Sequence, residues 1–212
     1  QVMPLSQATI SVEDRGFQFA DGVYEALRVY GGRVFTVDEH LERLERSCGG
    51  IQLAMPHTKA FLAAEISKLV AQSGLYDGTV YMQITRGACR RNHLFQPCPP
   101  TVLFYVRDVP ALPDPLANGG VKLLSVPDER WNRCWIKSIA LLPNVLARNA
   151  AHAAGADEAV FIHQGMVTEC SSSNILVVRG KELIAPPPGP KVLNGITRMM
   201  LLKVAPKAGL AP

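Results

Sequence analysis

The sequence predicts a mixed α+β chain built in two parts. Segments in which apolar and polar residues alternate, typical of β-strands, are joined by short glycine turns, which indicates hairpins. Helical segments with clear start and stop signals lie between them. Residues 108–120, "DVPALPDPLANGG", fit neither pattern and separate the two parts. We therefore predict an N-terminal α+β domain over 1–110, a linker over 111–120 and a C-terminal domain over 121–212.

The first part opens with a strand, a turn and a helix. Residues 23–30, "VYEALRVY", alternate as a strand does, and Gly31–Gly32 predicts a two-residue turn into the short strand "RVF". Thr36 and Glu39 have the spacing of a capping box, so a helix should begin there and end at Gly49–Gly50.

A second helix and two longer strands complete the first part. Thr58 precedes the helical segment 59–73, and Gly74 follows it. Two segments rich in β-branched and aromatic residues, 79–86 and 101–107, predict strands joined by a loop. The second part should alternate strands and helices in the same way. We expect strands at 121–126, 158–163 and 166–169, a hairpin around Arg179–Gly180, and helices at about 142–154 and from Ile196.

Composition and charge exclude several classes of protein. With 48% hydrophobic and 19% charged residues the chain is an ordinary globular one, and its net charge is only +4. Arg90–Arg91 is its only adjacent basic pair, too little for a nucleic-acid-binding surface, and no segment approaches a membrane span. Five cysteines without C-x-x-C spacing predict reduced thiols in a cytoplasmic protein and no metal site.

Lys137 is the first candidate for chemistry. It lies between apolar residues in "CWIKSIALLP". Apolar surroundings disfavour the charged form of a lysine, lower its pKa and leave the amine nucleophilic, as a Schiff-base lysine requires. Alternatively, the aliphatic stem is buried and the ammonium group reaches water. The segment by itself leaves both interpretations open.

Glu169 is the second candidate, because it stands beside three serines in "VTECSSSN". A carboxylate with clustered hydroxyl groups suits a site that hydrogen-bonds a polar heterocycle. The same serines also suit a turn, where their hydroxyls satisfy backbone groups. Here too both interpretations stay open.

Three further segments carry candidate binding groups. Gly195 leads into a helix that Thr197 could cap, and the N–H groups of such a helix start can bind a phosphate. Arg43 could add a countercharge, or lie on a solvated helix face. Arg91 and His93, in "RRNH", could clamp a carboxylate, or form an exposed basic loop.

Taken in order, these pieces resemble the fold-type IV pyridoxal-phosphate aminotransferases, and most closely their D-amino-acid branch. The segments that carry the resemblance span nearly the whole chain: 13–44, 81–95, 136–148, 157–174 and 193–198. It implies a two-domain α+β fold with a small N-terminal domain and a larger, barrel-like α/β C-terminal domain. Members of the family generally continue well past Pro212, so we expect the C-terminal domain to be truncated here.

The resemblance implies that the cofactor is pyridoxal 5'-phosphate (PLP). By similarity, Lys137 holds the cofactor as a Schiff base and moves the Cα proton. Glu169 resembles the glutamate that hydrogen-bonds the pyridine nitrogen and keeps it protonated. Arg43, Ile196 and Thr197 resemble the residues that bind the cofactor phosphate.

The remaining site residues also follow from the resemblance. Ser172 matches a serine beside the cofactor ring. Tyr24, Arg91 and His93 resemble a trap for the substrate α-carboxylate. In the family the arginine and the histidine come from the neighbouring subunit, which implies a homodimer.

The implied activity is ping-pong transamination between a D-amino acid, such as D-alanine, and a 2-oxo acid, such as 2-oxoglutarate. One alternative is a branched-chain L-amino-acid aminotransferase, since Arg28 falls where that branch also has an arginine. An (R)-amine transaminase, an aminodeoxychorismate lyase and a truncated non-catalytic homologue are the others. Ala20 and Cys170 stand where the family usually has glycine, which removes backbone freedom near the site.

Overall fold

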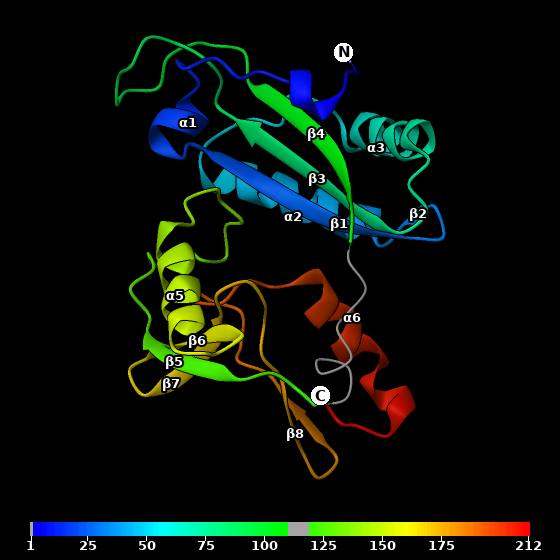
Figure 1. Ribbon diagram of the computed structural model, residues 1–212, viewed down its shortest axis with the longest axis vertical. Coiled ribbons are helices and arrows are strands. Elements are labelled where there is room, and N and C mark those ends of the chain that lie inside the picture. Colours follow the sequence, from blue (N-terminus) through cyan, green and yellow to red (C-terminus); the bar gives the residue numbers. More distant parts are fainter. Residues whose placement is uncertain (1, 110–118) are drawn as a thin grey trace. The chain divides into compact units, whose positions relative to one another are not determined.

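The computed structural model describes residues 2–109 and 119–212, which form two compact units (Figure 1). Unit 1 comprises Gln1–Pro110 and Ile136–Ala140, and unit 2 comprises Ala111–Trp135 and Leu141–Pro212. Most of the predicted linker, 111–120, lies outside the described residues.

Residues 136–140 differ from the predicted division, which put them in the C-terminal domain. They belong to unit 1 because their backbone pairs with the start of the first strand. The Tyr24 N–H donates to the Lys137 carbonyl at 3.0 Å, and the Ile139 N–H donates to the Gly22 carbonyl at 3.1 Å. Ile136 also lies in the apolar core of unit 1.

Unit 1 is built on a four-stranded antiparallel sheet of order β2-β1-β3-β4 (Figure 1). Its strands are β1 (Gly22–Tyr30), β2 (Arg33–Val34), β3 (Gly78–Thr85) and β4 (Thr101–Asp108). The predicted strands and the turn at Gly31–Gly32 are confirmed. In β1, Val23, Leu27 and Val29 are fully buried and alternate with less buried residues, so one face of the sheet forms the core.

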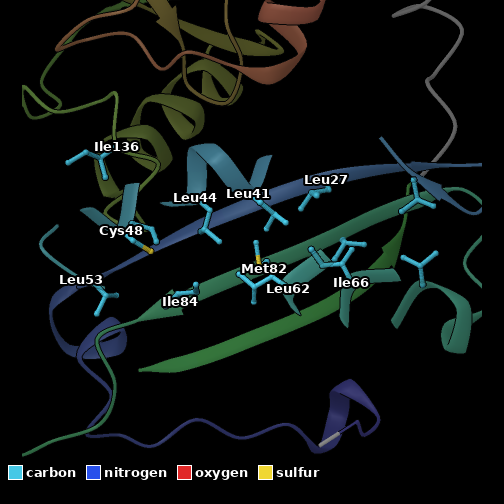
Figure 2. Close-up of a cluster of buried hydrophobic side chains, with 14 of the residues drawn as sticks. Leu27, Leu41, Leu44, Cys48, Leu53, Leu62, Ile66, Met82, Ile84 and Ile136 are labelled. Atoms are coloured by element: carbon cyan, nitrogen blue, oxygen red, sulfur yellow. The ribbon is translucent and has the colours of Figure 1, made fainter. Parts of the chain in front are cut away.

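Helices α2 (Val37–Gly50) and α3 (Lys59–Ser73) cover that face of the sheet (Figure 1). Figure 2 shows the core between helices and strands, where Leu41 and Leu44 of α2 meet Met82 and Ile84 of β3. The α3 boundaries are as predicted, because the Thr58 Oγ1 accepts a hydrogen bond from the Phe61 N–H at 3.2 Å.

The predicted capping box at Thr36 and Glu39 is wrong. Thr36 precedes α2 in a left-handed conformation, with φ of 53° and ψ of 44°, instead of the extended conformation of a capping residue. Its hydroxyl therefore does not face the N–H groups of the first turn and has no partner among the described residues. The helix boundary was predicted correctly, but the reason given for it was not.

Two short elements of unit 1 were not predicted: η1 (Leu5–Gln7) and α1 (Arg15–Phe19). Asp14 caps α1 by accepting a hydrogen bond from the Gly16 N–H at 2.8 Å. The helix ends at Ala20, which has a left-handed backbone with φ of 54° and ψ of 30°. The glycine that the family usually has here would adopt this conformation without strain.

Ala20→Gly should therefore stabilise the protein by about 1 kcal/mol, because a Cβ in the left-handed region costs about that much. The matched control is Ala64→Gly, at an exposed position inside α3. It should destabilise the protein by about 1 kcal/mol, since glycine weakens a helix interior. Thermal unfolding checks that the two substitutions change stability in opposite directions. A lower melting temperature for Ala20→Gly would contradict the expected strain at Ala20.

Unit 2 contains a three-stranded sheet of order β5-β6-β7 and a separate hairpin. β5 (Leu123–Pro127) and β6 (Glu158–His163) are parallel and are connected through α5 (Leu142–Ala153), while β7 (Met166–Cys170) is antiparallel to β6. The hairpin pairs β8 (Val177–Arg179) with β9 (Glu182–Ile184). Helix α6 (Ile196–Val204) and η2 (Ala205–Ala208) follow.

The mixed α+β class is confirmed, but the described part of unit 2 has no closed barrel-like sheet. The hairpin strands pair with each other and, through Glu182 of β9, with Ala211, but not with the three-stranded sheet. The main buried apolar cluster of unit 2 is small: it contains Phe161 and three alanines, Ala147, Ala151 and Ala159, with Leu124, Val126 and Ala156 packed against it. None of the helices in the ranges 2–109 and 119–212 combines the length and apolarity needed to cross a membrane.

Candidate active site

Lys137 is held in unit 1 by its backbone and its side chain. Its N–H donates to the Ser47 Oγ at 3.1 Å, and its carbonyl accepts from the Tyr24 N–H at 3.0 Å. The neighbours Ile136 and Ser138 are buried, and the Lys137 Nζ lies 4.1 Å from the centroid of the Tyr24 ring. The amine is therefore positioned over an aromatic ring on a fixed segment of backbone, as a reactive lysine requires.

Tyr24 is the first of three stacked tyrosines on the sheet face opposite α2 and α3. The ring centroids of Tyr24 and Tyr81 are 5.6 Å apart, and those of Tyr81 and Tyr105 are 4.8 Å apart. Burial, with smaller contributions from its two tyrosine neighbours, raises the pKa of Tyr81 to about 12. Tyr81 therefore stays neutral, and the row offers aromatic faces and hydroxyl groups beside Lys137.

A cavity of about 290 Å³ opens on the same sheet face. Gln83, Leu103 and Ile139 are among its lining residues, and Ile139 follows Lys137 by two positions. None of the predicted site residues, all of which lie in the described part of the chain, lines this cavity. It is an apolar space near the candidate lysine and contains no part of the predicted site.

Arg43, on α2, lies in a buried cluster with Glu25 and His40. Its Nε and Nη2 donate to Glu25 Oε1 at 2.8 Å and Oε2 at 2.7 Å, and the His40 Nδ1 is 2.7 Å from Glu25 Oε2. Burial works to raise the pKa of Glu25, but the hydrogen bonds and charges of Arg43 and His40 outweigh it and lower the pKa. Glu25 therefore stays ionised and orients the Arg43 guanidinium.

Sequence reasoning missed Glu25, although its position carried a signal. Glu25 falls between Val23 and Leu27 on the core-facing side of the alternating strand. A carboxylate at such a position must have buried partners, since an unpaired buried charge is very costly.

Arg91 and His93 lie in the loop between β3 and β4 and are both exposed. The Arg91 Cζ is 4.8 Å from the centroid of the Phe19 ring, and the His93 ring centroid is 5.4 Å from it. No hydrogen bond, ion pair or ring contact joins either residue to Tyr24 within the described ranges. One chain therefore brings Arg91 and His93 together, and Tyr24 and Lys137 together, as two separate groups.

Glu169, at the end of β7 in unit 2, is buried, and both of its carboxylate oxygens accept hydrogen bonds. Its Oε1 accepts from Arg130, and its Oε2 accepts from the Asn174 Nδ2 and from the Leu193 N–H, each at 3.0 Å. Burial raises the pKa of Glu169 and nearby Asp128 adds to the effect, while Arg130 and the Leu193 N–H oppose it. These contacts fix the position of the carboxylate. A carboxylate fixed in this way is suited to hydrogen-bond one defined atom of a ligand.

Arg130 connects Glu169 to a second buried carboxylate, that of Asp128. The Arg130 Nε and Nη2 donate to the Asp128 Oδ1 at 2.9 Å and Oδ2 at 2.8 Å. Burial works to raise the pKa of Asp128, but the hydrogen bonds and charge of Arg130, with a hydrogen bond from Thr168, lower it. Sequence reasoning missed Arg130, and no signal pointed to it, since "DERWNR" is typical of an exposed turn.

Ile196 and Thr197 begin helix α6, as predicted, but Thr197 does not cap it. Gly195 takes the capping position, and no side chain accepts a hydrogen bond from the first turn there. A Cβ on Gly195 would lie 2.0 Å from the Asn174 Oδ1, so any larger residue would displace the Asn174 side chain that holds Glu169. The first-turn N–H groups have no acceptor inside the helix, which suits them to bind a phosphate.

Ser172 is exposed, and its Oγ donates to the Glu158 Oε2 at 2.7 Å. Glu158 also accepts from Ser171 and pairs with the Arg148 Nη1 at 3.0 Å. The hydroxyl of Ser172 is therefore oriented by an ion pair. Its place beside a cofactor ring stays a prediction.

The residues of both units fit the chemistry of PLP. Unit 1 supplies a positioned amine at Lys137 and a buried guanidinium at Arg43. Unit 2 supplies a buried carboxylate at Glu169 and the N-terminus of α6. An amine can form a Schiff base with the aldehyde of PLP, and a carboxylate can hydrogen-bond its pyridine nitrogen. A guanidinium and a helix N-terminus can bind its phosphate.

Comparison with known proteins agrees with this chemistry. A sequence profile of the family described as amino-transferase class IV matches residues 22–212. The chain is 43% identical over 208 residues to the D-alanine aminotransferase of Listeria monocytogenes serotype 4b. The matched region covers 96% of this chain and 71% of the relative.

Two solved structures place the fold among aminotransferases. The branched-chain aminotransferase of Thermoproteus uzoniensis with norvaline has a TM-score of 0.88 and 25% identity, covering 100% of this chain and 74% of that one. A hypothetical aminotransferase of Mycobacterium tuberculosis, with alpha-ketoglutarate and PMP bound, has a TM-score of 0.87 and 22% identity, covering 100% of this chain and 77% of that one. This chain belongs to the class IV aminotransferases, which depend on PLP.

Proposed function

We propose that this protein catalyses PLP-dependent transamination between a D-amino acid, such as D-alanine, and a 2-oxo acid, such as 2-oxoglutarate. The observation that carries the proposal is the 43% identity to a D-alanine aminotransferase over 96% of the chain. The positioned amine of Lys137 and the buried carboxylate of Glu169 support it.

When bound, PLP supplies the sink for the electrons released as the substrate Cα loses its proton. Lys137 is the only group that we assign to proton movement: its Nζ takes the proton from Cα and later returns it. Because one amine works from one side, it delivers the proton to a single face, and the product has one configuration. The Tyr24 ring, 4.1 Å from this amine, limits the directions in which it can move.

Glu169, Arg43 and the start of α6 would hold the cofactor. Glu169 would accept a hydrogen bond from the protonated pyridine nitrogen, and Arg130 and Asn174 keep its carboxylate in one orientation. The Arg43 guanidinium and the first N–H groups of α6, with the Thr197 hydroxyl, would bind the phosphate. Ser172 would lie beside the ring.

A donor screen tests this function. The purified protein is incubated with PLP, 2-oxoglutarate and one of three donors: D-alanine, L-leucine or (R)-phenylethylamine. We expect pyruvate from D-alanine and little product from the other two. Turnover of L-leucine without D-alanine would make the protein a branched-chain aminotransferase, and turnover of none, with no cofactor bound, would make it a non-catalytic homologue.

We further propose a homodimer in which Arg91 and His93 of each subunit serve the other subunit's site. Both side chains are exposed and gather at Phe19, while Tyr24 lies with Lys137. One chain therefore has no complete carboxylate trap among its described residues, and a second copy would complete it. An arginine and a histidine on one loop suit a carboxylate ligand.

Mixing two inactive variants tests this exchange between subunits. Lys137→Ala and Arg91→Ala homodimers are unfolded together, refolded and assayed with D-alanine. If Arg91 acts across the interface, about a quarter of the wild-type activity should return, because half of the dimers are hybrids with one intact site of two. If Arg91 serves its own subunit, no hybrid has an intact site. Activity no higher than that of the Arg91→Ala parent would overturn the proposed exchange.

The proposed location is the cytoplasm. All five cysteines are unpaired in the structure, and Cys48, Cys134 and Cys170 are buried. Unpaired thiols are typical of a reducing compartment. Fractionation of the producing cells, with activity measured in each fraction, tests this location.

A further inference from the structure

The loop that joins β3 to β4 is closed at its base by a narrow approach of its two arms. Gly87, in the first arm, has φ of 103°, and a Cβ there would lie 1.9 Å from the carbonyl oxygen of Pro99 in the second arm. The first arm is also tied to α1, since the Arg15 N–H donates to the Gly87 carbonyl at 2.9 Å. The base of the loop is therefore fixed by backbone contacts.

Cys89 and Cys98 face each other at this base. Their sulfur atoms are 3.4 Å apart, and the Cys98 thiol donates to the Cys89 sulfur. The Cys98 Sγ is also 3.2 Å from the Arg86 carbonyl oxygen, and the Cys89 N–H donates to the Glu13 carbonyl at 3.3 Å. A disulfide has its sulfur atoms about 2.05 Å apart, so the two must approach by about 1.4 Å.

Accessibility separates these two cysteines from the other three. Cys89 and Cys98 are half-buried, whereas Cys48, Cys134 and Cys170 are buried. Burial raises the pKa of Cys98, and its hydrogen bond to Cys89 adds to the effect. Cys98 therefore keeps its proton and can donate it to the Cys89 sulfur.

We propose that Cys89 and Cys98 form a dithiol site that a hydroperoxide converts reversibly to a disulfide. The Cys89 thiolate attacks one oxygen of hydrogen peroxide, the O–O bond breaks, and hydroxide leaves and is protonated to water. The Cys98 sulfur then attacks the sulfur of the Cys89 sulfenic acid, the S–O bond breaks, and the second water leaves with the Cys98 proton. Two thiols are oxidised and one peroxide is reduced to two waters. An added dithiol reverses the step by exchange.

The disulfide would close a ring around residues 90–97, which include Arg91 and His93. This consequence rests on the proposed function, in which these two residues bind the substrate carboxylate. Drawing the arms together displaces the segment between them, and displacements of about 1 Å in a binding site are costly. We therefore expect oxidation to raise the KM for D-alanine about fivefold and to change kcat much less.

Thiol counting on the PLP-loaded enzyme tests the site itself. After treatment with hydrogen peroxide, removal of the excess and unfolding, the free thiols should fall from the five of the sequence to three, since one disulfide consumes two. Dithiothreitol should restore all five. Peptide mapping should find one cross-linked pair, Cys89 with Cys98.

Three variants give this experiment its controls. Cys89→Ser and Cys98→Ser should each remove the cross-linked peptide and the change in KM. Cys134→Ser should keep both, because its hydroxyl can replace the thiol that lies 3.2 Å from the Trp131 carbonyl oxygen. Five thiols remaining after peroxide, or a cross-link between other cysteines, would overturn the proposal.

The remaining outcomes separate this proposal from the proposed function. A cross-link with an unchanged KM would confirm the dithiol site and overturn its influence on substrate binding. Absence of any transamination in the reduced enzyme would overturn the proposed function, while the thiol count and the peptide map would still decide the disulfide.

Discussion

Lys137→Ala should lower the turnover of D-alanine by at least about 1,000-fold, because the variant would lose both the covalent anchor that we propose for the cofactor and the proposed base for the Cα proton. The measurement is pyruvate formation from D-alanine and 2-oxoglutarate at saturating PLP. Borohydride treatment should fix the cofactor onto the wild-type peptide that contains Lys137, and the variant should stay unlabelled.

Lys68→Ala is the matched control for this loss. Lys68 lies on α3 in the same unit, and its side chain is 55% exposed. Its removal should leave turnover and labelling unchanged. Both variants should melt near the wild-type temperature, which shows that the loss is chemical. Retained labelling in Lys137→Ala would assign the anchoring amine to another lysine.

Arg130→Met should lower the free energy of unfolding by about 3–5 kcal/mol, the usual effect of removing one partner from a buried ion pair. Glu169 would lose its countercharge, and the fully buried Asp128 would keep only Lys191, whose Nζ lies 3.8 Å from its Oδ1. Urea denaturation at neutral pH measures the change. Arg179→Met, which breaks the exposed pair with Glu182, should cost about 0.5 kcal/mol or less.

The stability difference between Arg130→Met and the wild type should depend on pH. The pKa of Asp128 is lower in the folded state than in the unfolded state, so its stabilising effect is complete above the unfolded value, about 3.9, and is lost as pH falls through the folded value. In Arg130→Met both carboxylates become neutral as the pH falls. The difference from wild type should therefore shrink below about pH 4, and a constant difference would contradict the ion-pair explanation.

The elements with clear periodicity and end signals could be predicted from the sequence. The strands of unit 1 and the helices α2, α3, α5 and α6 fall within a few residues of the expected bounds. α1 could not, because a five-residue helix is too short to show a period. At Thr36 the residue type was right for a cap, but the backbone conformation that decides capping was not visible in the sequence.

The sequence predicted which residues belong to the candidate site better than it predicted how other residues hold them in place. The resemblance named Lys137, Glu169 and Arg43, but not the partners that hold them. Arg130 stands 39 positions before Glu169, and only the fold brings the two together. Glu25 was within reach of sequence reasoning, because its core-facing position in β1 required buried partners.

The pairing of residues 137–139 with β1 also affects the order in which the chain can be completed during synthesis. Residues 1–110 leave the ribosome first, but they lack Ile136 in their core and one partner for the edge of β1. Unit 1 can reach its final structure only after part of unit 2 has been synthesised. Lys137 therefore enters unit 1 as one of its last pieces, so a nascent chain that has not passed Ala140 is incompletely packed and lacks the amine to which we assign the chemistry.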